Sequence, residues 1–355
     1  MNWLWLRSGK RKLKFSVKNK YRSMLLFGVF VILIAFFCSG FSGSANIKLT
    51  SVMDIVKFKF LGVNSKTLDE SEITIIWNLR MPRAVLAIFI GGGLALSGVV
   101  MQSITQNILA EPYMVGVSSG ALCFVTFFYF IRVSFINTWL GRSVVAFTGS
   151  ILALLLVYKI SNAGRKIANS RLILTGMAVS TMLTAMSNFF IIATPNNNII
   201  KGILSWTMGS VASARWDNVI FPCIVISISA IYLFFKAKKY DVISLGDETA
   251  LSLGVNVQKL KKESIVLVSV MAGVAVASCG LIGFVGFIVP HILRKVISPN
   301  HIYLLPLSFI YGGGFLCISD IIARTVLSPQ DLPIGLITAF FGSPVFIYLL
   351  LKEKM

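Results

Sequence analysis

The chain has 355 residues, of which 56% are hydrophobic and 13% are charged, and its formal net charge is +20. A soluble protein of this length could not bury so many long apolar runs, so the composition is that of a polytopic membrane protein. The positive charge does not indicate nucleic-acid binding, because no basic patch carries interleaved aromatic residues or a known binding module. The basic residues lie between the apolar runs instead, which is the bias that orients membrane helices.

Several apolar segments are candidates to cross the bilayer, for which about 20 apolar residues suffice. The predicted fold class is therefore all-α, a polytopic membrane protein with about ten transmembrane helices, including short broken ones. The segments cover residues 24–42, 83–104, 114–132, 143–161, 172–194, 217–236, 264–280, 282–296, 303–324 and 334–351. The segment 282–296 is short for a full crossing, and its glycines and Pro290 predict a helix broken inside the bilayer.

The remaining residues divide around these spans. We expect a basic cytoplasmic tail over 1–23, one transmembrane permease domain over 24–351 and a cytoplasmic tail over 352–355, so that both termini lie in the cytoplasm. Within the permease domain, residues 43–82 are expected to form an external segment with one short helix. Residues 237–263 are expected to form a cytoplasmic segment.

The amino terminus allows a second interpretation. A basic stretch, an apolar run and Ser42-Gly43-Ser44-Ala45 resemble a secretory signal with a small-residue cleavage site. The basic region is long and many spans follow it, so an uncleaved first transmembrane helix is favoured.

Arginines mark the external mouth of the second span. Arg80-Met81-Pro82-Arg83 closes the external segment, and Pro82 suits the first turn of the next helix. Arg324 ends the outward-running ninth span, so the three arginines are expected at one external face, where ion pairs are exposed to solvent. Interfacial snorkelling explains them without a partner. Docking of an acidic partner explains them equally well.

Two acidic residues lie in or beside the spans, where carboxylates can serve as proton or ion sites. Glu111 follows the second span, and a role in capping the next helix is favoured for it. Asp320 is spaced to pair with Arg324 at i, i+4. A secondary transporter coupled to ions would need more buried carboxylates than these, so that class of protein is disfavoured.

Neither catalytic nor metal chemistry is indicated. His291 and His301 supply no nucleophile–base pair and no metal motif, and a packing and capping role is favoured for His291 over ligation of iron or haem. The cysteines are scattered through apolar runs without a CxxC pair, so they are interpreted as buried hydrophobic residues. We expect no metal site and no enzyme activity in this chain.

A polar stretch between the sixth and seventh spans has the pattern of a short amphipathic helix. Asp247 and Glu248 stand in its first turn, where acidic residues suit the helix dipole, and Gly254 is suited to end it. A helix lying on the membrane surface would carry basic residues on its polar face, whereas here lysines flank the helix. The pattern favours docking to a protein.

Several motifs follow one another from Arg80 to the last span. They are Arg80-Met81-Pro82-Arg83, Gly98-Val99-Val100-Met101-Gln102, Asn107-Ile108-Leu109-Ala110-Glu111-Pro112, Gly116-Val117-Ser118-Ser119-Gly120-Ala121, Leu245 to Gly254, Gly283 to Arg294, Asp320-Ile321-Ile322-Ala323-Arg324, Leu332-Pro333-Ile334-Gly335 and Gly342-Ser343-Pro344. This series resembles the FecCD-type permeases, the membrane subunits of ABC importers for iron-siderophores, haem and vitamin B12. Residues 1–79 carry little of the resemblance, and Ile108 stands where the family commonly has proline.

The resemblance implies the fold of the vitamin B12 and iron-siderophore importers and an assembly around the chain. The expected partners are a second permease subunit, most simply in a homodimer, two cytoplasmic ABC ATPase subunits, an extracytoplasmic substrate-binding protein and the lipid bilayer of the cytoplasmic membrane. The chain has no GxxxxGK[ST] phosphate loop. We therefore expect ATP and Mg²⁺ on the partner ATPase and no cofactor on this chain. An iron-siderophore is the first cargo expected, with haem second and cobalamin as a further alternative.

The resemblance also assigns roles to residues. Docking of the binding protein falls on Arg80, Arg83 and Arg324, and the inner gate falls on Asn169 and Ser170. The residues that couple the permease to the ATPase are Ser244, Leu245, Gly246, Asp247, Glu248, Thr249, Ala250, Leu251, Leu253 and Gly254.

Overall fold

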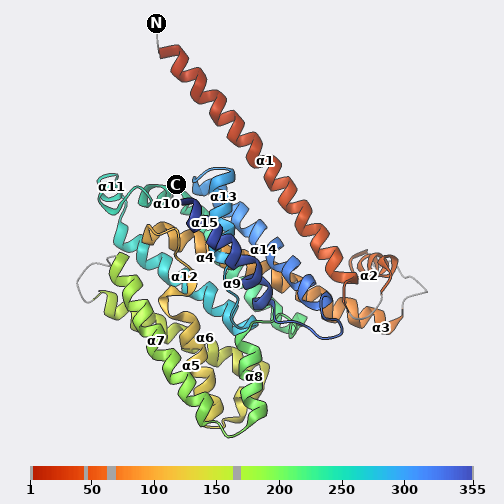
Figure 1. Ribbon diagram of the computed structural model, residues 1–355. Coiled ribbons are helices and arrows are strands. Elements are labelled where there is room, and N and C mark those ends of the chain that lie inside the picture. Colours follow the sequence, from red (N-terminus) through yellow and green to blue (C-terminus); the bar gives the residue numbers. More distant parts are fainter. Residues whose placement is uncertain (1–2, 44–46, 62–68, 163–168, 354–355) are drawn as a thin grey trace.

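The structure is a computed structural model that describes the chain except for residues 1–2, 44–46, 62–68, 163–168 and 354–355, and the described part consists of helices and connecting loops (Figure 1). In chain order the elements are α1 (Trp3–Phe41), α2 (Leu49–Leu61), α3 (Glu70–Ile73), η1 (Thr74–Arg80), α4 (Met81–Thr105), η2 (Pro112–Val115), α5 (Val117–Phe130), η3 (Ser134–Asn137), α6 (Trp139–Ser161), α7 (Asn169–Ala193), α8 (Asn197–Thr207), α9 (Trp216–Phe235), α10 (Ala237–Ile243), α11 (Asp247–Ser252), α12 (Val257–Cys279), α13 (Val285–Val296), α14 (His301–Thr325) and α15 (Ile334–Glu353).

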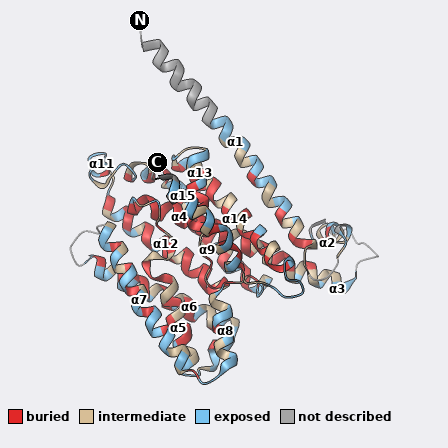
Figure 2. Cartoon of the chain, in the orientation of Figure 1, coloured by how far each residue is buried: buried red, intermediate tan, exposed pale blue. Residues whose placement is uncertain are grey.

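Helix α4 is the centre of the fold. It packs against α14, α13, α12 and α9 and is buried along most of its length (Figure 2). Small residues allow the close contacts between helices that hold a membrane bundle together. A Cβ atom at Gly98 would lie 1.6 Å from the carbonyl oxygen of Gly286. The contact between α4 and α13 is therefore backbone against backbone, and any side chain at Gly98 would separate the two helices.

Two further groups of helices surround this centre. Helix α5 packs against α6 and α7, and α6 also contacts α12. Helix α1 lies along α14, and its amino-terminal part projects beyond the rest of the molecule (Figure 1). Helices α1 and α7 are mostly exposed in the isolated chain, as expected of surfaces that face lipid or another subunit.

The predicted fold class is confirmed. Each predicted span coincides with a helix, and seven helices of the described chain are long and apolar enough to cross a membrane. The shorter apolar helices are α5 and the part of α15 from Ile334 to Tyr348, and α13 has 12 residues. Helix α8 was not predicted, and it begins where the Asn196 side chain accepts hydrogen bonds from the backbone N–H groups of Asn198 and Ile199.

The segment 282–296 begins with a break in the helical chain, as Gly283 predicts, but Pro290 lies inside the continuous helix α13 and does not break it. Helix α12 ends at Cys279, and the chain passes through positive φ angles at Gly280 (φ 72°) and Phe284 (φ 69°) before α13 begins. The 12 residues of α13 extend about 18 Å, whereas the hydrocarbon core of a bilayer is about 30 Å thick. Helix α13 therefore cannot cross alone.

The helix that contains Pro82 begins earlier than predicted. Helices α3, η1 and α4 are continuous from Glu70 to Thr105, so Pro82 lies inside a helix of 36 residues. Proline lacks an N–H group and its ring displaces the carbonyl one turn earlier. The π-helical stretch η1 adjoins it, and Met81 N–H bonds to the Ile76 carbonyl. This i→i−5 pattern widens the helix at the proline instead of ending it.

Residues 43–82, expected to form an external segment, are also more helical than expected, because α2 precedes α3 and η1. At the amino terminus, α1 runs without a break from Trp3 to Phe41, so most of the expected tail 1–23 extends the first span as one helix. Residues 44–46 lie outside the described residues, and the cleavage site considered at Ser44 and Ala45 lies there.

Candidate functional site

The two sets of candidate residues lie at opposite ends of α4 (Figure 1). Arg83 stands in the first turn of α4, and Gln106, directly after its last residue, donates from Nε2 to the Ile243 carbonyl at 3.2 Å. A helix of 25 residues is about 37 Å long. The predicted docking arginines and the predicted coupling residues are thus separated by roughly the thickness of a bilayer.

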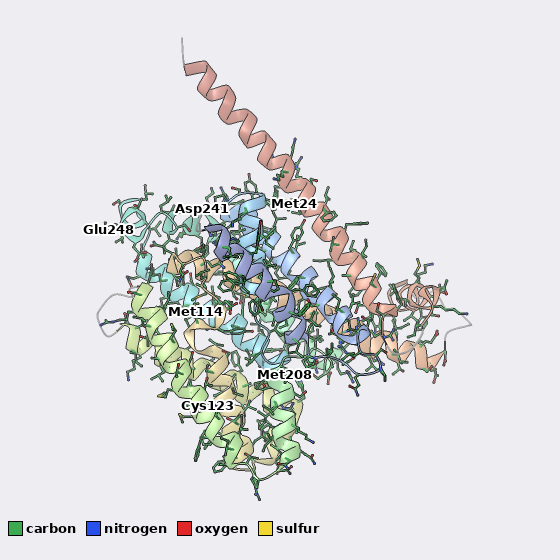
Figure 3. All side chains as sticks on the ribbon, in the orientation of Figure 1. Met24, Met114, Cys123, Met208, Asp241 and Glu248 are labelled. Atoms are coloured by element: carbon green, nitrogen blue, oxygen red, sulfur yellow. The ribbon has the colours of Figure 1, made fainter. Side chains whose placement is uncertain are left out.

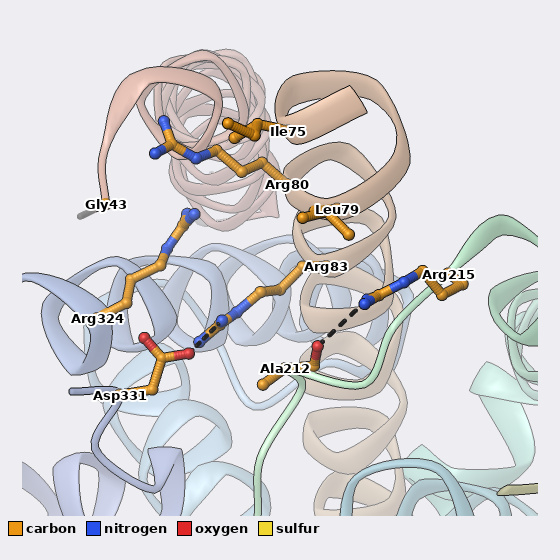
Figure 4. Close-up of a pocket in the computed structure, with 9 residues that line it drawn as sticks. All are labelled: Gly43, Ile75, Leu79, Arg80, Arg83, Ala212, Arg215, Arg324 and Asp331. Carbon is orange, nitrogen blue, oxygen red and sulfur yellow. Dashed lines mark hydrogen bonds and ion pairs between the residues drawn. The ribbon is translucent and has the colours of Figure 1, made fainter. Parts of the chain in front are cut away.

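Four arginines surround a cavity of about 320 Å³ at the Arg83 end of α4 (Figure 4). We call them the arginine cluster: Arg80, Arg83, Arg215 and Arg324. Arg83 is held by two carboxylates, with its Nε 2.7 Å from Asp320 Oδ1 and its Nη1 2.7 Å from Asp331 Oδ2. Four guanidinium groups against two carboxylates leave the cluster net positive, so it is suited to an anionic partner.

The two outer ends of the cluster are tied to the end of α1. Arg80 Nη1 donates to the Gly40 carbonyl at 2.9 Å, and Arg324 Nη2 donates to Ser39 Oγ. Arg324 Nε also lies 3.3 Å from Asp320 Oδ2, which confirms the i, i+4 pair predicted from the sequence. Asp320 therefore forms ion pairs with arginines of both α4 and α14. Its spacing from Arg324 in the sequence predicted only the pair within α14.

The arginines are less exposed than their predicted position suggested. The exposed fraction is 6% for Arg80 and 4% for Arg324, because their guanidinium groups turn toward the end of α1. Arg83 is similarly covered by its carboxylate partners. The expectation of solvent exposure is thus wrong for Arg80 and Arg324, whereas the Arg83–Asp331 pair lies at an exposed carboxylate; the three arginines do lie together as predicted. Their docking role stays a prediction.

Arg215 was missed in the sequence. It precedes α9, donates from Nη1 to the Ala214 carbonyl at 2.8 Å, and has an exposed side chain. Its backbone N–H bonds to Asn218 Oδ1 at 2.8 Å, which fixes the start of α9. A basic residue at the start of an inward-running span is the same signal that drew attention to Arg83, and it would have identified Arg215.

Arg83→Met is expected to destabilise the fold by about 3–5 kcal/mol, because it leaves the buried Asp320 carboxylate with one arginine partner fewer. The measurement is the free energy of unfolding in detergent. Arg83→Met combined with Asp320→Asn removes the buried carboxylate but also takes the carboxylate partner from the buried Arg324, so we expect it to recover only part of the loss. Equal destabilisation by the single and double variants would contradict the assigned role of this pair.

At the other end of α4, α10 and α11 form a short helical pair, which we call the α10–α11 segment (residues 237–254). Gly246 turns the chain between them with φ 114°, a conformation that favours glycine. Helix α11 ends at a left-handed Gly254, whose N–H bonds to the Leu251 carbonyl while Val255 N–H bonds to the Ala250 carbonyl, both at 2.9 Å. This paired pattern is a Schellman cap, and it confirms the predicted role of Gly254 in ending the helix.

The exposed surface of α11 is apolar and acidic at once. Leu245, Leu251 and Leu253 each expose more than half of their surface, and Glu248 is exposed beside them (Figure 3). Ala250, in contrast, is fully buried and holds α11 against the molecule. Exposed leucines around a carboxylate are typical of a surface that another protein covers.

Asp241 anchors α10. Its Oδ1 accepts hydrogen bonds from the backbone N–H of His301 and from the ring Nδ1, both at 2.7 Å. His301 Nε2 lies 2.6 Å from Ser103 Oγ of α4, so three helices meet at this imidazole. Nearby, burial raises the pKa of the Tyr240 phenol, and its oxygen lies 2.8 Å from Ser264 Oγ. These contacts fix α10 to the centre of the fold.

Asp247 anchors α11 through a buried lysine. Lys261 of α12 is 1% exposed, and its Nζ donates to Asp247 Oδ2 and, at 2.6 Å, to Asn169 Oδ1. Asn169 is the first residue of α7, and Ser170 beside it is exposed. The structure thus joins a predicted coupling residue and a predicted gate residue through a lysine that the sequence interpretation treated only as part of a flanking basic group.

The structure also places Glu111 and His291, for which the sequence favoured capping and packing roles. The Glu111 side chain makes no cap at the helix that follows, and its carboxylate accepts the backbone N–H of Phe284 before α13 instead. The capping role favoured for Glu111 is therefore wrong, because α5 begins only after Gly116. The buried ring of His291 lies 6.2 Å from the ring of Phe287 on the same helix.

A model of the FecCD transport family matches residues 31–352. The chain belongs to this family. It is 34% identical over 341 residues to the Fe(3+)-citrate import system permease protein YfmD of Bacillus subtilis, which covers 96% of this chain and 98% of that protein. It is 32% identical over 341 residues to the hemin transport system permease protein HmuU of Yersinia pestis, which covers 95% of this chain and 98% of that protein.

The fold is also similar to that of a solved transporter structure. A solved structure of a metal-chelate type ABC transporter in an inward-facing conformation matches with a TM-score of 0.79 and 28% identity, over 94% of this chain and 99% of that one. The chain is accordingly a membrane-spanning permease subunit of an ABC importer, a transport component and not a catalytic enzyme.

Proposed function

We propose that this permease imports an iron-siderophore or a similar ferric chelate across the cytoplasmic membrane. The observation that carries the proposal is similarity over nearly the whole chain to a Fe(3+)-citrate permease and a hemin permease. Haem is the second cargo, favoured by the latter relative. The cargo makes no covalent bond to the permease, so the chain needs neither a cofactor nor a catalytic residue, and ATP with Mg²⁺ acts on a separate ATPase.

The α10–α11 segment is the proposed cytoplasmic docking site for the ATPase. Its exposed leucines and Glu248 offer an apolar contact with one charge, and Gly246 and Gly254 set the ends of α11. Lysines close α9 and open α12 on the same side, which agrees with the positive-inside bias. Both termini are assigned to the cytoplasm by the same bias.

The arginine cluster is the proposed external docking site for a substrate-binding protein. Its net positive cavity suits acidic side chains of a partner, and it lies at the end of α4 opposite the α10–α11 segment. Binding at one end and ATP-driven closure at the other would then bias rocking of the permease between outward-open and inward-open states.

We propose that two copies of the chain form the permease, with two ATPase subunits on the cytoplasmic side. Helix α7 supports this arrangement, because Met177, Met182 and Met186 are exposed along it and a second subunit would cover part of that surface. The gate assigned to Asn169 and Ser170 then lies at the cytoplasmic end of α7, beside the pathway between the subunits.

The cargo is tested by uptake in a strain that lacks only this gene. We expect complementation to restore uptake of a ⁵⁵Fe-labelled ferric chelate, and we would compare ferric citrate, ferric hydroxamates, haemin and ⁵⁷Co-cobalamin in parallel. A Glu248→Lys variant is the matched control, because it should insert into the membrane normally but should not couple transport to the ATPase. Restoration of cobalamin uptake alone would overturn the iron proposal while leaving the importer class in place.

A further inference from the structure

We propose that Lys261 transmits the movement of the coupling helix α11 to the cytoplasmic end of α7, and so opens or closes the gate. The inference rests on the proposed function, because it assumes that an ATPase moves α11. It adds a positioning residue on α12, outside both the docking surface and the gate.

The geometry places one ammonium group between two helices that are far apart in the sequence. Lys261 Nζ donates to Asp247 Oδ2 on α11 and to Asn169 Oδ1 on α7. Lysine has three N–H donors and no acceptor, so two of its three bonds connect the moving element to the gate. The side chain is 1% exposed, which keeps water from competing for these bonds.

Because Lys261 is buried, its two bonds persist only while α11 and α7 keep their present separation. A buried ammonium needs its carboxylate partner, since the loss of Asp247 would leave a desolvated charge. If α11 shifts away, Lys261 must either follow Asp247 and leave Asn169 or stay and leave Asp247. Asp247 carries the opposite charge whereas the Asn169 amide is neutral, so we expect Lys261 to follow Asp247 and to release the first residue of α7. A solvent-exposed lysine would rehydrate and transmit nothing.

The other aspartate of the α10–α11 segment gives a contrast. Asp241 binds His301, which in turn meets Ser103, and these residues lie on α14 and α4 at the centre of the fold. Asp241 therefore fixes α10, whereas Asp247 is tied through Lys261 to α7, which is mostly exposed in the isolated chain. Gly246 lies between the two aspartates and allows α11 to move while α10 stays in place.

The test follows the reactivity of a cysteine introduced at the exposed position 170, beside Asn169. In a background without the five native cysteines, the Ser170→Cys permease is purified in nanodiscs with its co-purifying ATPase. A membrane-impermeant maleimide labels it with and without Mg²⁺, ATP and vanadate. This readout needs no cargo and no binding protein.

We expect the labelling rate to change about fivefold or more with nucleotide, within the usual range for coupled sites. Asn169→Ala should reduce this change to less than about twofold while the Asp247–Lys261 pair, the ATPase association and the thermal midpoint persist. Lys261→Met should lose the response as well. Adding Asp247→Asn to Lys261→Met should recover stability but not the response. Lys262→Met is the matched control, since the exposed neighbouring lysine should respond as the wild type does.

Three results would overturn the inference. The first is an Asn169→Ala response equal to wild type. The second is recovery of the response together with stability in the Asp247→Asn, Lys261→Met double variant, which would leave Lys261 a structural role only. The third is no change in wild type although the ATPase is bound, which would leave the proposed function intact. Absence of any co-purifying ATPase would instead remove the proposed function, and the inference with it.

Discussion

Ala250→Pro is expected to abolish transport while the permease still inserts and folds. The backbone N–H of Ala250 bonds to the Gly246 carbonyl at 2.9 Å, and its side chain is fully buried. Proline removes that bond and costs about 3 kcal/mol or more inside a helix. Helix α11 has only six residues, so it has no other turn with which to recover. The leucines and Glu248 would then no longer form one surface.

The measurement is co-purification of the ATPase with the permease, together with uptake by cells. Ser252→Ala is the matched control, because Ser252 is an exposed residue of α11 outside the predicted coupling residues, and alanine keeps the helix. Glu248→Lys separates charge from shape, since it reverses one exposed charge without breaking α11. ATPase recovery with Ala250→Pro equal to that with wild type would show that α11 is not the docking element.

The features that the sequence revealed are local ones. Hydrophobic length is a property of each segment alone, so each span could be placed without knowing its neighbours. The break before α13 coincides with Gly280 and Gly283, whereas Pro290 lies inside α13, and the ends of α11 follow from Asp247 and Gly254. Each of these signals affects only the backbone within a few residues of its own position in the sequence.

The features that the sequence did not reveal depend on neighbours distant in the chain. Asp320 is 237 residues from Arg83, and Lys261 is 92 residues from Asn169. No spacing rule connects such residues until the helices are packed. The prediction from Pro82 was wrong for a different reason. Proline is a local signal for the start of a helix, but the π-helical stretch beside Pro82 lets the helix continue through it.

The external site yields a pair of variants with effects of opposite sign. Arg215→Glu is expected to lower the affinity for the binding protein by about tenfold, which corresponds to about 1.4 kcal/mol. Asp331→Asn is expected to raise it, because it removes a carboxylate from the rim and leaves Arg83 with only Asp320 as a carboxylate partner. Arg215 and the side chain of Asp331 are both more than a third exposed, so neither change should disturb the fold.

The measurement is the association rate and affinity of the binding protein for the permease in nanodiscs at low and high salt. Steering by charge acts mainly on association and weakens as salt increases, so both effects should shrink at high salt. Lys201→Glu on α8 makes the same charge change as Arg215→Glu at an exposed position outside the arginine cluster. An equal loss of affinity with Lys201→Glu would show that the effect of Arg215→Glu comes from the net charge of the permease and not from the arginine cluster. A loss with Asp331→Asn would mean that the partner does not approach the cluster with acidic residues. Joining α1, α4 and α14 would then be the remaining role of Arg80, Arg83 and Arg324.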